Sequence, residues 1–492
     1  MFWFRLFSTD LARDVAMAPK SETAITWDEN LSQAEELIPI IGRLYRQNGV
    51  VLSIHGRSLI NRNPIQLLKA HRYARHIDGI PLAIEDSAKL IKLLDELNLA
   101  PASIDVARLL SAHLNHGGGF ETYIRSQLAT IINGHDAELQ NTRDVVLYGF
   151  GRIGRLVARI LLAQAGDRRG LELKAIVVRK GSDDDLVKRA SLLRRDSVHG
   201  AFDGTITVDE KQSLIIANGN VIKVIYADNP ATIDYEAHGI HNALVIDNTG
   251  RWRDEAGLSE HLKSKGVAKV LLTAPGKGSL PNVVYGINHE DINDQKIVTA
   301  ASCTTNAITP VLKVLDDAFG VDFGHVETVH SFTNDQNLID NFHKGERRGR
   351  AAGLNMVITE TGAASAVSKA LPSFEGKLTG NAIRVPTPDV SMAILNLTLS
   401  KPVTKLELNQ TLRHASLESS LRNQIDYIES PEVVSSDFIG SNRAGIVDGL
   451  ATIGTGKHAV VYVWYDNENG YSHQVVRVAQ KVAGVARPSF PN

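Results

Sequence analysis

Residues 144–162 have the sequence DVVLYGFGRIGRLVARILL, and this stretch decides the fold of the larger part of the chain. It begins as a short apolar strand, passes a glycine-rich turn, and continues as an amphipathic helix that starts near Arg152 and Ile153. The glycines of the turn are Gly149, Gly151 and Gly154. The first makes the tight turn, the second lets the backbone approach a pyrophosphate, and the third allows the helix to pack on the strand. We therefore predict a Rossmann-type dinucleotide-binding domain, with the phosphates on the free N–H groups of the helix N-terminus.

The end of the next strand bears on the choice of dinucleotide. The segment LELKAIVVRK ends in Arg179 and Lys180, at the place where NAD-selective proteins usually hold an Asp or Glu against the ribose hydroxyls. A carboxylate repels a 2′-phosphate whereas two cations attract it, so the pair favours NADP, or the use of both NAD and NADP. The alternative is that one of the aspartates at 183–185 turns back and binds the ribose.

Composition bounds the class of protein. The chain has 492 residues, 43% apolar and 22% charged, so it can bury the cores of several domains. Its 53 basic and 55 acidic side chains give a net charge of −2, which favours neither nucleic acid nor an anionic membrane as a partner. The apolar start MFWFRLF is too short for a secretory signal, and the single cysteine excludes an intramolecular disulfide. We expect a cytoplasmic protein whose partners are small molecules and other subunits.

Residues 1–141 have the pattern of a separate, all-helical module. Thr26 and Glu29 match a capping box at the start of a first helix, and Pro64 opens a second one. Further helices are expected near 87–97, near 104–115 and after the glycines at 117–119. Residues 1–16 fit neither this module nor a targeting signal, so Met17 is a second candidate for the start of translation.

Four histidines lie on these expected helices, namely His71, His76, His113 and His116. Metal ligation by them is conceivable, because imidazole is a common ligand. Their spacings of five and three are also those of ordinary, partly exposed helix histidines, and we favour this interpretation and expect no metal.

A second stretch carries the candidate chemistry. Residues 297–310, IVTAASCTTNAITP, are expected to form a strand, a polar turn that holds Cys303, and a helix. The positive end of that helix would point at the sulfur, so we expect a lowered thiol pKa. A later apolar strand ends in His330, a natural base for the thiol. Cysteine and histidine also suit a thiol protease or an acyltransferase, but the dinucleotide fold upstream favours hydride transfer.

Eight motifs follow one another between residue 144 and about 485: GFGRIGR at 149–155, RDSVHG at 195–200, NTGRW at 248–252, ASCTTN at 301–306, RRGRAA at 347–352, TGAA at 361–364, RVPTPDVS at 384–391 and WYDNENGYS at 464–472. In type, order and spacing they resemble the glyceraldehyde-3-phosphate dehydrogenase family. The resemblance implies α/β and α+β architecture: a Rossmann NAD(P)-binding domain over 142–301, completed by a C-terminal helix over 470–492, and a catalytic domain over 302–469. It also implies a homotetramer.

The resemblance further implies reversible, NAD(P)-dependent phosphorylating oxidation of glyceraldehyde 3-phosphate, a reaction of glycolysis and gluconeogenesis. Cys303 would attack the aldehyde, His330 would take the hydroxyl proton as hydride leaves, and inorganic phosphate would cleave the thioester to give 1,3-bisphosphoglycerate. Arg384 and Thr333 would bind the substrate's own phosphate. By the same motifs, the attacking phosphate would lie on Ser302, Thr304, Thr361 and Gly362, and the cofactor on Thr249, Gly250, Asn467 and Tyr471, besides the glycine-rich turn.

The chain departs from the family pattern at two places. Val178-Arg179 replaces the usual Asn-Asp pair after the second strand, so NAD selectivity does not carry over. In the loop at 333–350, Asp335 replaces a small polar residue and Asn341-Phe342 replaces a Gly-Pro pair. These features resemble NADP-using members that work in the biosynthetic direction, and also erythrose-4-phosphate dehydrogenases. Retention of Thr361-Gly362 favours the triose phosphate and phosphorolysis over hydrolysis of the thioester.

A function of another class is that of a scaffold or regulatory protein, in which the N-terminal module docks a partner and the rest of the chain is only a support. Loss of Cys303, His330 or Arg384 would favour this alternative. All three residues are present, so an enzyme with an added interaction module is the better interpretation.

Overall fold

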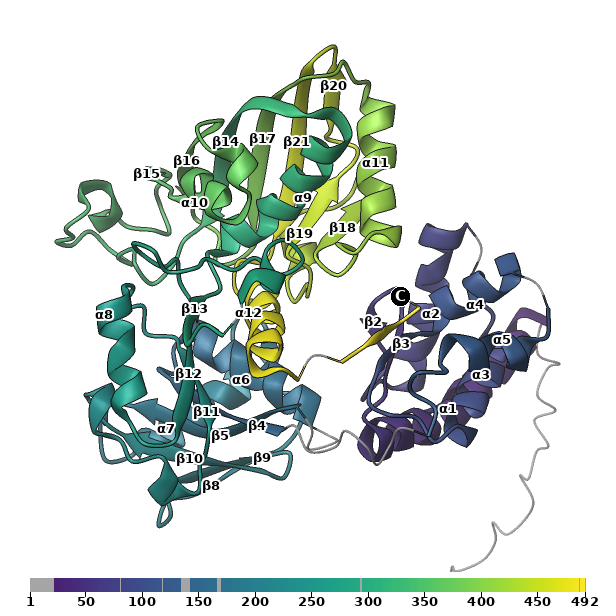
Figure 1. Ribbon diagram of the computed structural model, residues 1–492, viewed down its shortest axis with the longest axis horizontal. Helices are drawn as coiled ribbons and strands as arrows, with labels where there is room; N and C mark the ends of the chain where they lie inside the picture. The colour runs from purple at the N-terminus through teal and green to yellow at the C-terminus, as the bar shows by residue number, and fades with distance from the viewer. Residues whose placement is uncertain are drawn as a thin grey trace, which may run out of the picture. The chain divides into compact units, whose positions relative to one another are not determined.

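The computed structural model describes residues 22–79, 81–116, 118–133, 142–165, 170–292, 294–485 and 487–491. The chain forms two compact units (Figure 1). Met1–His135 with Pro488–Asn492 form the N-terminal unit, and Asp136–Arg487 form the main unit. The second start candidate, Met17, lies outside the described residues. Among the described helices, none has both the length and the apolar character needed to cross a membrane.

The helices of the N-terminal unit confirm most of the expected ones. They are α1 (Glu22–Asn48), α2 (Pro64–Asp78), α3 (Ile84–Glu96), α4 (Val106–His116) and α5 (Phe120–Gln127). At the start of α2 the side chain of Asn63 accepts the N–H of Gln66, and the Gln66 side chain accepts the N–H of Asn63. The predicted cap at Thr26 is wrong, because α1 already begins at Glu22 and no glycine or proline separates the two residues.

The expectation that this unit contains only helices is also corrected. A four-stranded sheet in the order β2-β1-β3-β22 lies within it, built from β2 (Arg57–Ser58), β1 (Val51–Ile54), β3 (Ser103–Asp105) and β22 (Ser489–Phe490). These strands are too short to show a period of two along the chain. The last strand comes from the other end of the sequence: β22 runs parallel to β3, and Phe490 is 5% exposed among the core residues of the unit.

The first half of the main unit is the predicted Rossmann-type domain. Its sheet has the order β13-β12-β11-β4-β5-β10-β9-β8, with parallel neighbours from β13 to β10. The strands are β4 (Thr142–Tyr148), β5 (Gly170–Val178), β8 (Ile206–Asp209), β9 (Leu214–Ala217), β10 (Asn220–Tyr226), β11 (Ala243–Asp247), β12 (Val267–Leu272) and β13 (Ile297–Thr299). The helices of this half are α6 (Arg152–Gln164), α7 (Asp185–Arg194) and α8 (Glu255–Leu258), and a hairpin joins β6 (Arg195–Asp196) to β7 (Gly200–Ala201).

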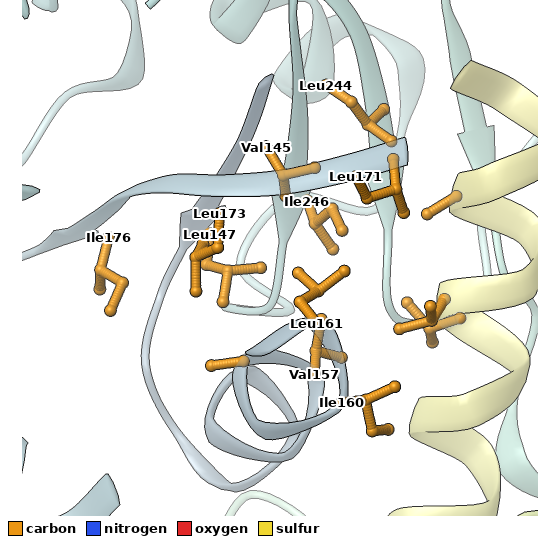
Figure 2. Packing of buried hydrophobic residues seen from close by; sticks show 14 of the residues in the cluster. Val145, Leu147, Val157, Ile160, Leu161, Leu171, Leu173, Ile176, Leu244 and Ile246 are labelled. Carbon is orange, nitrogen blue, oxygen red and sulfur yellow. The ribbon is translucent and has the colours of Figure 1, made fainter. Parts of the chain in front are cut away.

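The core of this half is formed between the sheet and two helices. Figure 2 shows Val157 and Leu161 of α6 pointing toward Val145 and Ile246 of the strands, with Ile160 turned toward α12 (Asn469–Ala483). The C-terminal helix was predicted over residues 470–492, but α12 is shorter and ends at Ala483. The next residue, Gly484, has a φ of 70° that glycine adopts without strain, so the chain leaves the domain there.

The second half of the main unit is a mixed sheet in the order β15-β16-β14-β17-β21-β19-β18, with β20 paired to β21. The strands are β14 (Val321–Ser331), β15 (Val357–Glu360), β16 (Leu378–Val385), β17 (Ser391–Leu399), β18 (Ile425–Ile428), β19 (Gly445–Asp448), β20 (Ile453–Thr455) and β21 (His458–Tyr465). The helices α9 (Cys303–Phe319), α10 (Ala363–Ala370) and α11 (Lys405–Glu418) cover one face of it (Figure 1). This arrangement brings Cys303, at the start of α9, to the end of β14 that carries His330.

Candidate active site

The glycine-rich turn lies between β4 and α6, and two of its glycines are required by close packing. A Cβ on Gly149, whose φ is 93°, would lie 2.9 Å from Thr249 Cγ2, and a Cβ on Gly154 would lie 2.6 Å from the carbonyl oxygen of Gly149. Gly151 differs, because no protein atom lies within 4 Å of a Cβ placed there. No side chain caps the N–H groups at the start of α6. The open face at Gly151 and these free donors fit the pyrophosphate of a dinucleotide.

The side chain of Arg152 is not free to bind that pyrophosphate. Its guanidinium bonds to the carboxylates of Asp196 and Glu468. Burial would raise the pKa of Asp196, but N–H bonds from Val198 and His199 together with Arg152 outweigh it and lower that pKa to about 2. Arg152, like Ile153 after it, can therefore offer a phosphate only its backbone N–H group.

Arg179 and Lys180 follow β5 directly and are exposed. The turn lies beside them, because the N–H of Gly149 donates to the carbonyl of Val177 in β5 at 2.9 Å. Asp185, one of the acids that could replace a ribose-binding carboxylate, instead accepts the N–H of Gly181 at 3.0 Å and the guanidinium of Arg189. The end of β5 thus carries two exposed cations, and Asp183, another of these acids, lies 3.6 Å from Lys180 Nζ.

Thr249 and Gly250 follow β11 and close the other side of the turn. The N–H and the hydroxyl of Thr249 both donate to Asp247 Oδ1, at 2.8 and 2.7 Å. The second carboxylate oxygen of Asp247 lies 3.0 Å from His261 Nε2, and both side chains are fully buried. The sequence analysis did not identify Asp247 or His261. The available signal was the aspartate at the end of the apolar strand β11, since the ends of parallel strands carry the polar groups of a binding site.

Cys303 is the first residue of α9, with Ser302 as its N-cap: the Ser302 hydroxyl accepts the N–H of Thr305 at 3.0 Å. The Cys303 Sγ lies 3.5 Å from His330 Nε2. Next to His330 in the sheet is its register partner on β16, Arg384. The fold therefore places the thiol, the imidazole and a guanidinium in one group, as the motifs predicted.

Two neighbours of His330 Nδ1 bear on its tautomer: the carbonyl oxygen of Ser331 at 2.7 Å, which can only accept, and Arg384 Nη1 at 3.0 Å, which can only donate. The shorter contact, with Ser331, favours a proton on Nδ1, and this tautomer leaves the lone pair of Nε2 facing the thiol. Burial, and next the charge of Arg384, lower the pKa of His330 to about 3. A neutral imidazole beside Cys303 is suited to act as a general base.

The expected lowering of the Cys303 thiol pKa is not confirmed. Burial raises that pKa, and the opposing effects of Arg384 and of the hydroxyl and N–H of Thr304 are smaller. The helix N-terminus does not compensate for the loss of hydration around the sulfur, and His330 is uncharged. The pair is therefore a thiol and an uncharged imidazole at neutral pH.

A pocket of about 720 Å³ opens over this pair. Its lining includes each residue predicted to bind a phosphate, namely Ser302, Thr304, Thr333, Thr361, Gly362 and Arg384. Two helices, α9 and α10, begin at its wall, and the Thr361 hydroxyl accepts the N–H of Ala363 at the start of α10. The sequence analysis missed five further cations of the lining: Arg251, Arg253, Lys277, Lys344 and Arg348. Helix N-termini and cations at one pocket make it a site for anions.

Comparison with known proteins assigns the family. Residues 143–255 match the NAD binding domain, and residues 302–467 the C-terminal domain, of glyceraldehyde 3-phosphate dehydrogenase. A glyceraldehyde-3-phosphate dehydrogenase-like protein of Pseudomonas aeruginosa is 59% identical over 460 residues, 92% of this chain and 100% of the relative. Glyceraldehyde-3-phosphate dehydrogenase 1 of Bacillus subtilis is 39% identical over 342 residues, 69% of this chain and 98% of the relative. The chain belongs to the glyceraldehyde-3-phosphate dehydrogenase family.

Membership of this family makes the chain an oxidoreductase of the glyceraldehyde-3-phosphate dehydrogenase type with a nicotinamide cofactor, and it confirms the expected link with glycolysis and gluconeogenesis. The Pseudomonas aeruginosa match spans more residues than the main unit holds, so it extends into the N-terminal unit. The chloroplastic glyceraldehyde-3-phosphate dehydrogenase A of Zea mays, 43% identical, matches 68% of this chain and 81% of its own length.

Asn467 and Tyr471 do not line this pocket. The Tyr471 hydroxyl donates to the carbonyl of Ala301, two residues before Cys303, at 3.0 Å. Asn467 is buried at the start of the segment that leads into α12. Tyr471 therefore supports the turn that holds the thiol, whereas Asn467 accepts hydrogen bonds from Ser331 and Ser391.

The histidines that were weighed as metal ligands have other surroundings. His71 Nδ1 lies 2.8 Å from the Leu67 carbonyl, and His113 and His116 pack against Tyr123; the side chain of His76 lies outside the described residues. Among the described residues, the group with metal-like spacing is a different one: His199, Asp389 and Asp466. His199 Nε2 lies 3.1 and 3.2 Å from the two carboxylates. Burial lowers the pKa of His199, but its bonds to these aspartates outweigh this effect and raise the pKa to about 10. His199 is therefore protonated at neutral pH, and its positive charge pairs with the two carboxylates.

Proposed function

We propose that the chain oxidises the aldehyde of glyceraldehyde 3-phosphate with NAD(P) and transfers the acyl group from a thioester on Cys303 to inorganic phosphate, which gives 1,3-bisphosphoglycerate in a reversible reaction. The observation that carries the proposal is the distance of 3.5 Å between Cys303 Sγ and His330 Nε2 at the floor of a pocket lined with anion-binding groups. A nucleophile with its base, next to sites for two phosphates, is what this reaction requires.

The neutral pair sets the order of proton movements. As the sulfur bonds to the aldehyde carbon, the thiol proton passes to His330 Nε2 and from there to the new alkoxide. The same nitrogen then takes the hydroxyl proton while hydride leaves the carbon, which gives the thioester. The nicotinamide, when bound, accepts that hydride. An oxygen of inorganic phosphate next attacks the thioester carbon, the C–S bond breaks, and Cys303 leaves as a thiolate that takes up a proton.

The polar residues of the pocket divide into two anion subsites. Arg384 and Thr333 hold the phosphate of the substrate, because a guanidinium and a hydroxyl bind a dianion well. Ser302, Thr304, Thr361 and Gly362 hold the attacking phosphate, where the N-termini of α9 and α10 add donors. Asp335, which lines the same pocket, bonds to Arg348 and so limits the net charge of the first subsite.

We also propose that NADP is used besides NAD. The supporting observation is that Arg179 and Lys180 are exposed after β5, while Asp185 is bonded to Gly181 and Arg189. A 2′-phosphate placed at the end of β5 meets two cations there.

We also propose a homotetramer, and its supporting observation is the apolar surface of the loop between β14 and β15. The apolar side chains of Leu338, Ile339, Phe342, Leu354 and Met356 are 73–91% exposed. Such a cluster is typical of an interface, and a second copy of the chain offers the same self-complementary surface.

Initial rates test the proposal and its rival, erythrose-4-phosphate oxidation. Both aldehydes are assayed with NAD and with NADP, each with and without inorganic phosphate. The expected result is a higher kcat/KM for the triose phosphate, an absolute requirement for inorganic phosphate, and activity with both dinucleotides. A higher kcat/KM for erythrose 4-phosphate, or a rate independent of phosphate, would reject the proposed reaction.

A further inference from the structure

The amide of Asn467 is held at one end only. Its Oδ1 accepts two hydroxyl bonds, from Ser331 and from Ser391, each at 2.8 Å. No described residue accepts a bond from Nδ2, and this nitrogen is not among the buried polar atoms that lack a partner. The amide nitrogen therefore retains access to a ligand, whereas the amide oxygen is fully used.

The two serines also determine which way the amide points. Both are buried, with 0% and 1% of their surface exposed. The oxygen of Ser391 already accepts the N–H of Ser331 at 3.1 Å, and the two serine oxygens are 3.4 Å apart. If the amide of Asn467 were turned by 180°, both hydroxyl protons would point at an NH₂ group and lose their acceptor. Buried donors without an acceptor are strongly disfavoured, so the oxygen stays on the serines.

The two serines that fix the amide of Asn467 lie next to the catalytic base, His330. Ser331 is the next residue after His330 on β14, and Ser391 begins β17, which pairs with β14. Asn467 follows Tyr465, whose hydroxyl lies 2.9 Å from Thr304 Oγ1 and 2.7 Å from Thr328 Oγ1. The orientation of one amide is thus fixed relative to the residues around Cys303.

We propose that Ser331 and Ser391 are positioning residues that make Asn467 recognise the oxygen, and not the nitrogen, of the nicotinamide carboxamide. The proposal rests on the proposed dehydrogenase function, for which the sequence motifs place Asn467 at the cofactor. Because Nδ2 is only a donor, it bonds to a carboxamide in one of its two orientations. The serines thereby select one rotational position of the nicotinamide ring over the thiol.

Equilibrium binding of three dinucleotides tests this role without relying on turnover. Besides NAD, the probes are its 3-acetylpyridine analogue, which keeps the oxygen but lacks the NH₂ group, and its thionicotinamide analogue, which keeps the NH₂ group but has a weakly accepting sulfur. In the wild type, the acetylpyridine analogue should bind within about threefold of NAD and the thio analogue about tenfold more weakly, the value of one hydrogen bond. In the double variant S331A/S391A the amide is free to turn and can offer either end to the ligand, so the two analogues should bind about equally.

The matched control is Ser416→Ala. Ser416 is also a buried serine of the catalytic half, but its hydroxyl donates only to the carbonyl of Arg413 at 2.8 Å, and its removal should leave the wild-type order of the analogues. If the double variant does not fold, Asn467→Asp serves instead. It keeps acceptors for the serines but offers no donor to the ligand, so here the order of the analogues should reverse.

The possible outcomes distinguish failure of the role proposed for the serines from failure of the proposed dehydrogenase function. An unchanged order in the folded double variant, or in Asn467→Asp, overturns the role of the serines while the dehydrogenase assignment stands. A wild type that binds NAD and NADP but treats both analogues alike overturns the role of Asn467 as well. If the wild type binds none of the dinucleotides, it is the proposed function that fails.

Discussion

Replacing Phe490 by alanine should destabilise the N-terminal unit, although this residue is close to the end of the chain. Phe490 is 5% exposed and packs in the core of that unit, and its strand β22 pairs with β3. The N–H of Ser103 in β3 donates to the carbonyl of Pro488 at 2.8 Å, so the backbone of the tail is bound as well. The substitution removes the ring but leaves these backbone bonds possible.

The expected loss follows from the burial of the ring. Truncation of a buried phenylalanine to alanine costs about 3–5 kcal/mol, and we expect about 3 kcal/mol here because an edge strand of two residues can relax around the cavity. With a urea m-value of ~1.5 kcal/mol/M for a unit of this size, the unfolding midpoint of the N-terminal unit should fall by about 2 M. Urea unfolding followed by circular dichroism should then show an early transition that the wild type lacks.

Two comparisons decide whether this reasoning holds. Ser489→Ala, in the same strand, keeps the backbone pairing and removes no core side chain, so its midpoint should stay within about 0.3 M of the wild type. The kcat of the Phe490 variant should be unchanged, since the ring lies in the other unit from Cys303. An unshifted midpoint would show that the tail does not contribute to the core, and a parallel loss of kcat would show that the two units act as one.

Four further outcomes are expected. Cys303→Ser should lower kcat at least ~1,000-fold, measured by the initial rate, and leave the dissociation constant for the dinucleotide nearly unchanged. Arg179→Asp should raise the KM for NADP about tenfold with little change for NAD; a wild type without any NADP-linked rate would contradict the role of this cation. His199, whose pKa rises from 6.5 to about 10 on folding, contributes stability that is complete below pH 6.5 and is lost as the pH rises through 10, so His199→Gln should flatten the decline of the main unit's melting temperature between pH 7 and 10. A chain without 1–141 and without 488–492 should keep the kcat of the full chain, and a folded but inactive product would assign the N-terminal unit a part in the site.

Much of the main unit could be predicted because its information is local. Strand, glycines and helix at 144–162 constrain one another within a single turn, and the structure adds that a Cβ on Gly149 or Gly154 would collide with neighbouring atoms. The end of α12 could also have been predicted, since Gly484 and Pro488 both stand in the sequence as stop signals. Strand β22 could not, because two residues carry no periodicity and their partner lies near the other end of the chain.

The candidate site also has features that could be predicted from local sequence and others that could not. The motifs name Cys303, His330 and Arg384, and the fold brings the three together, since the type of residue and its place at the end of an element are local features. The thiol pKa is not local. Its direction depends on how far the surrounding elements bury the sulfur and on the neutral state of the imidazole, and both follow from packing between α9, β14 and β16. The carboxylate partner of Arg152, Glu468, is likewise distant in sequence and was not foreseen.

The path of the chain has a consequence for any study of the N-terminal unit. The unit takes its last strand from Pro488–Asn492, so its sheet is complete only after the whole main unit has been synthesised. Removing only residues 1–141 would leave Phe490 without its core and expose an unpaired strand, which favours aggregation. Loss of soluble enzyme after such a deletion would therefore say nothing about catalysis. The deletion separates the two roles only when the tail is removed together with the helices that bury it.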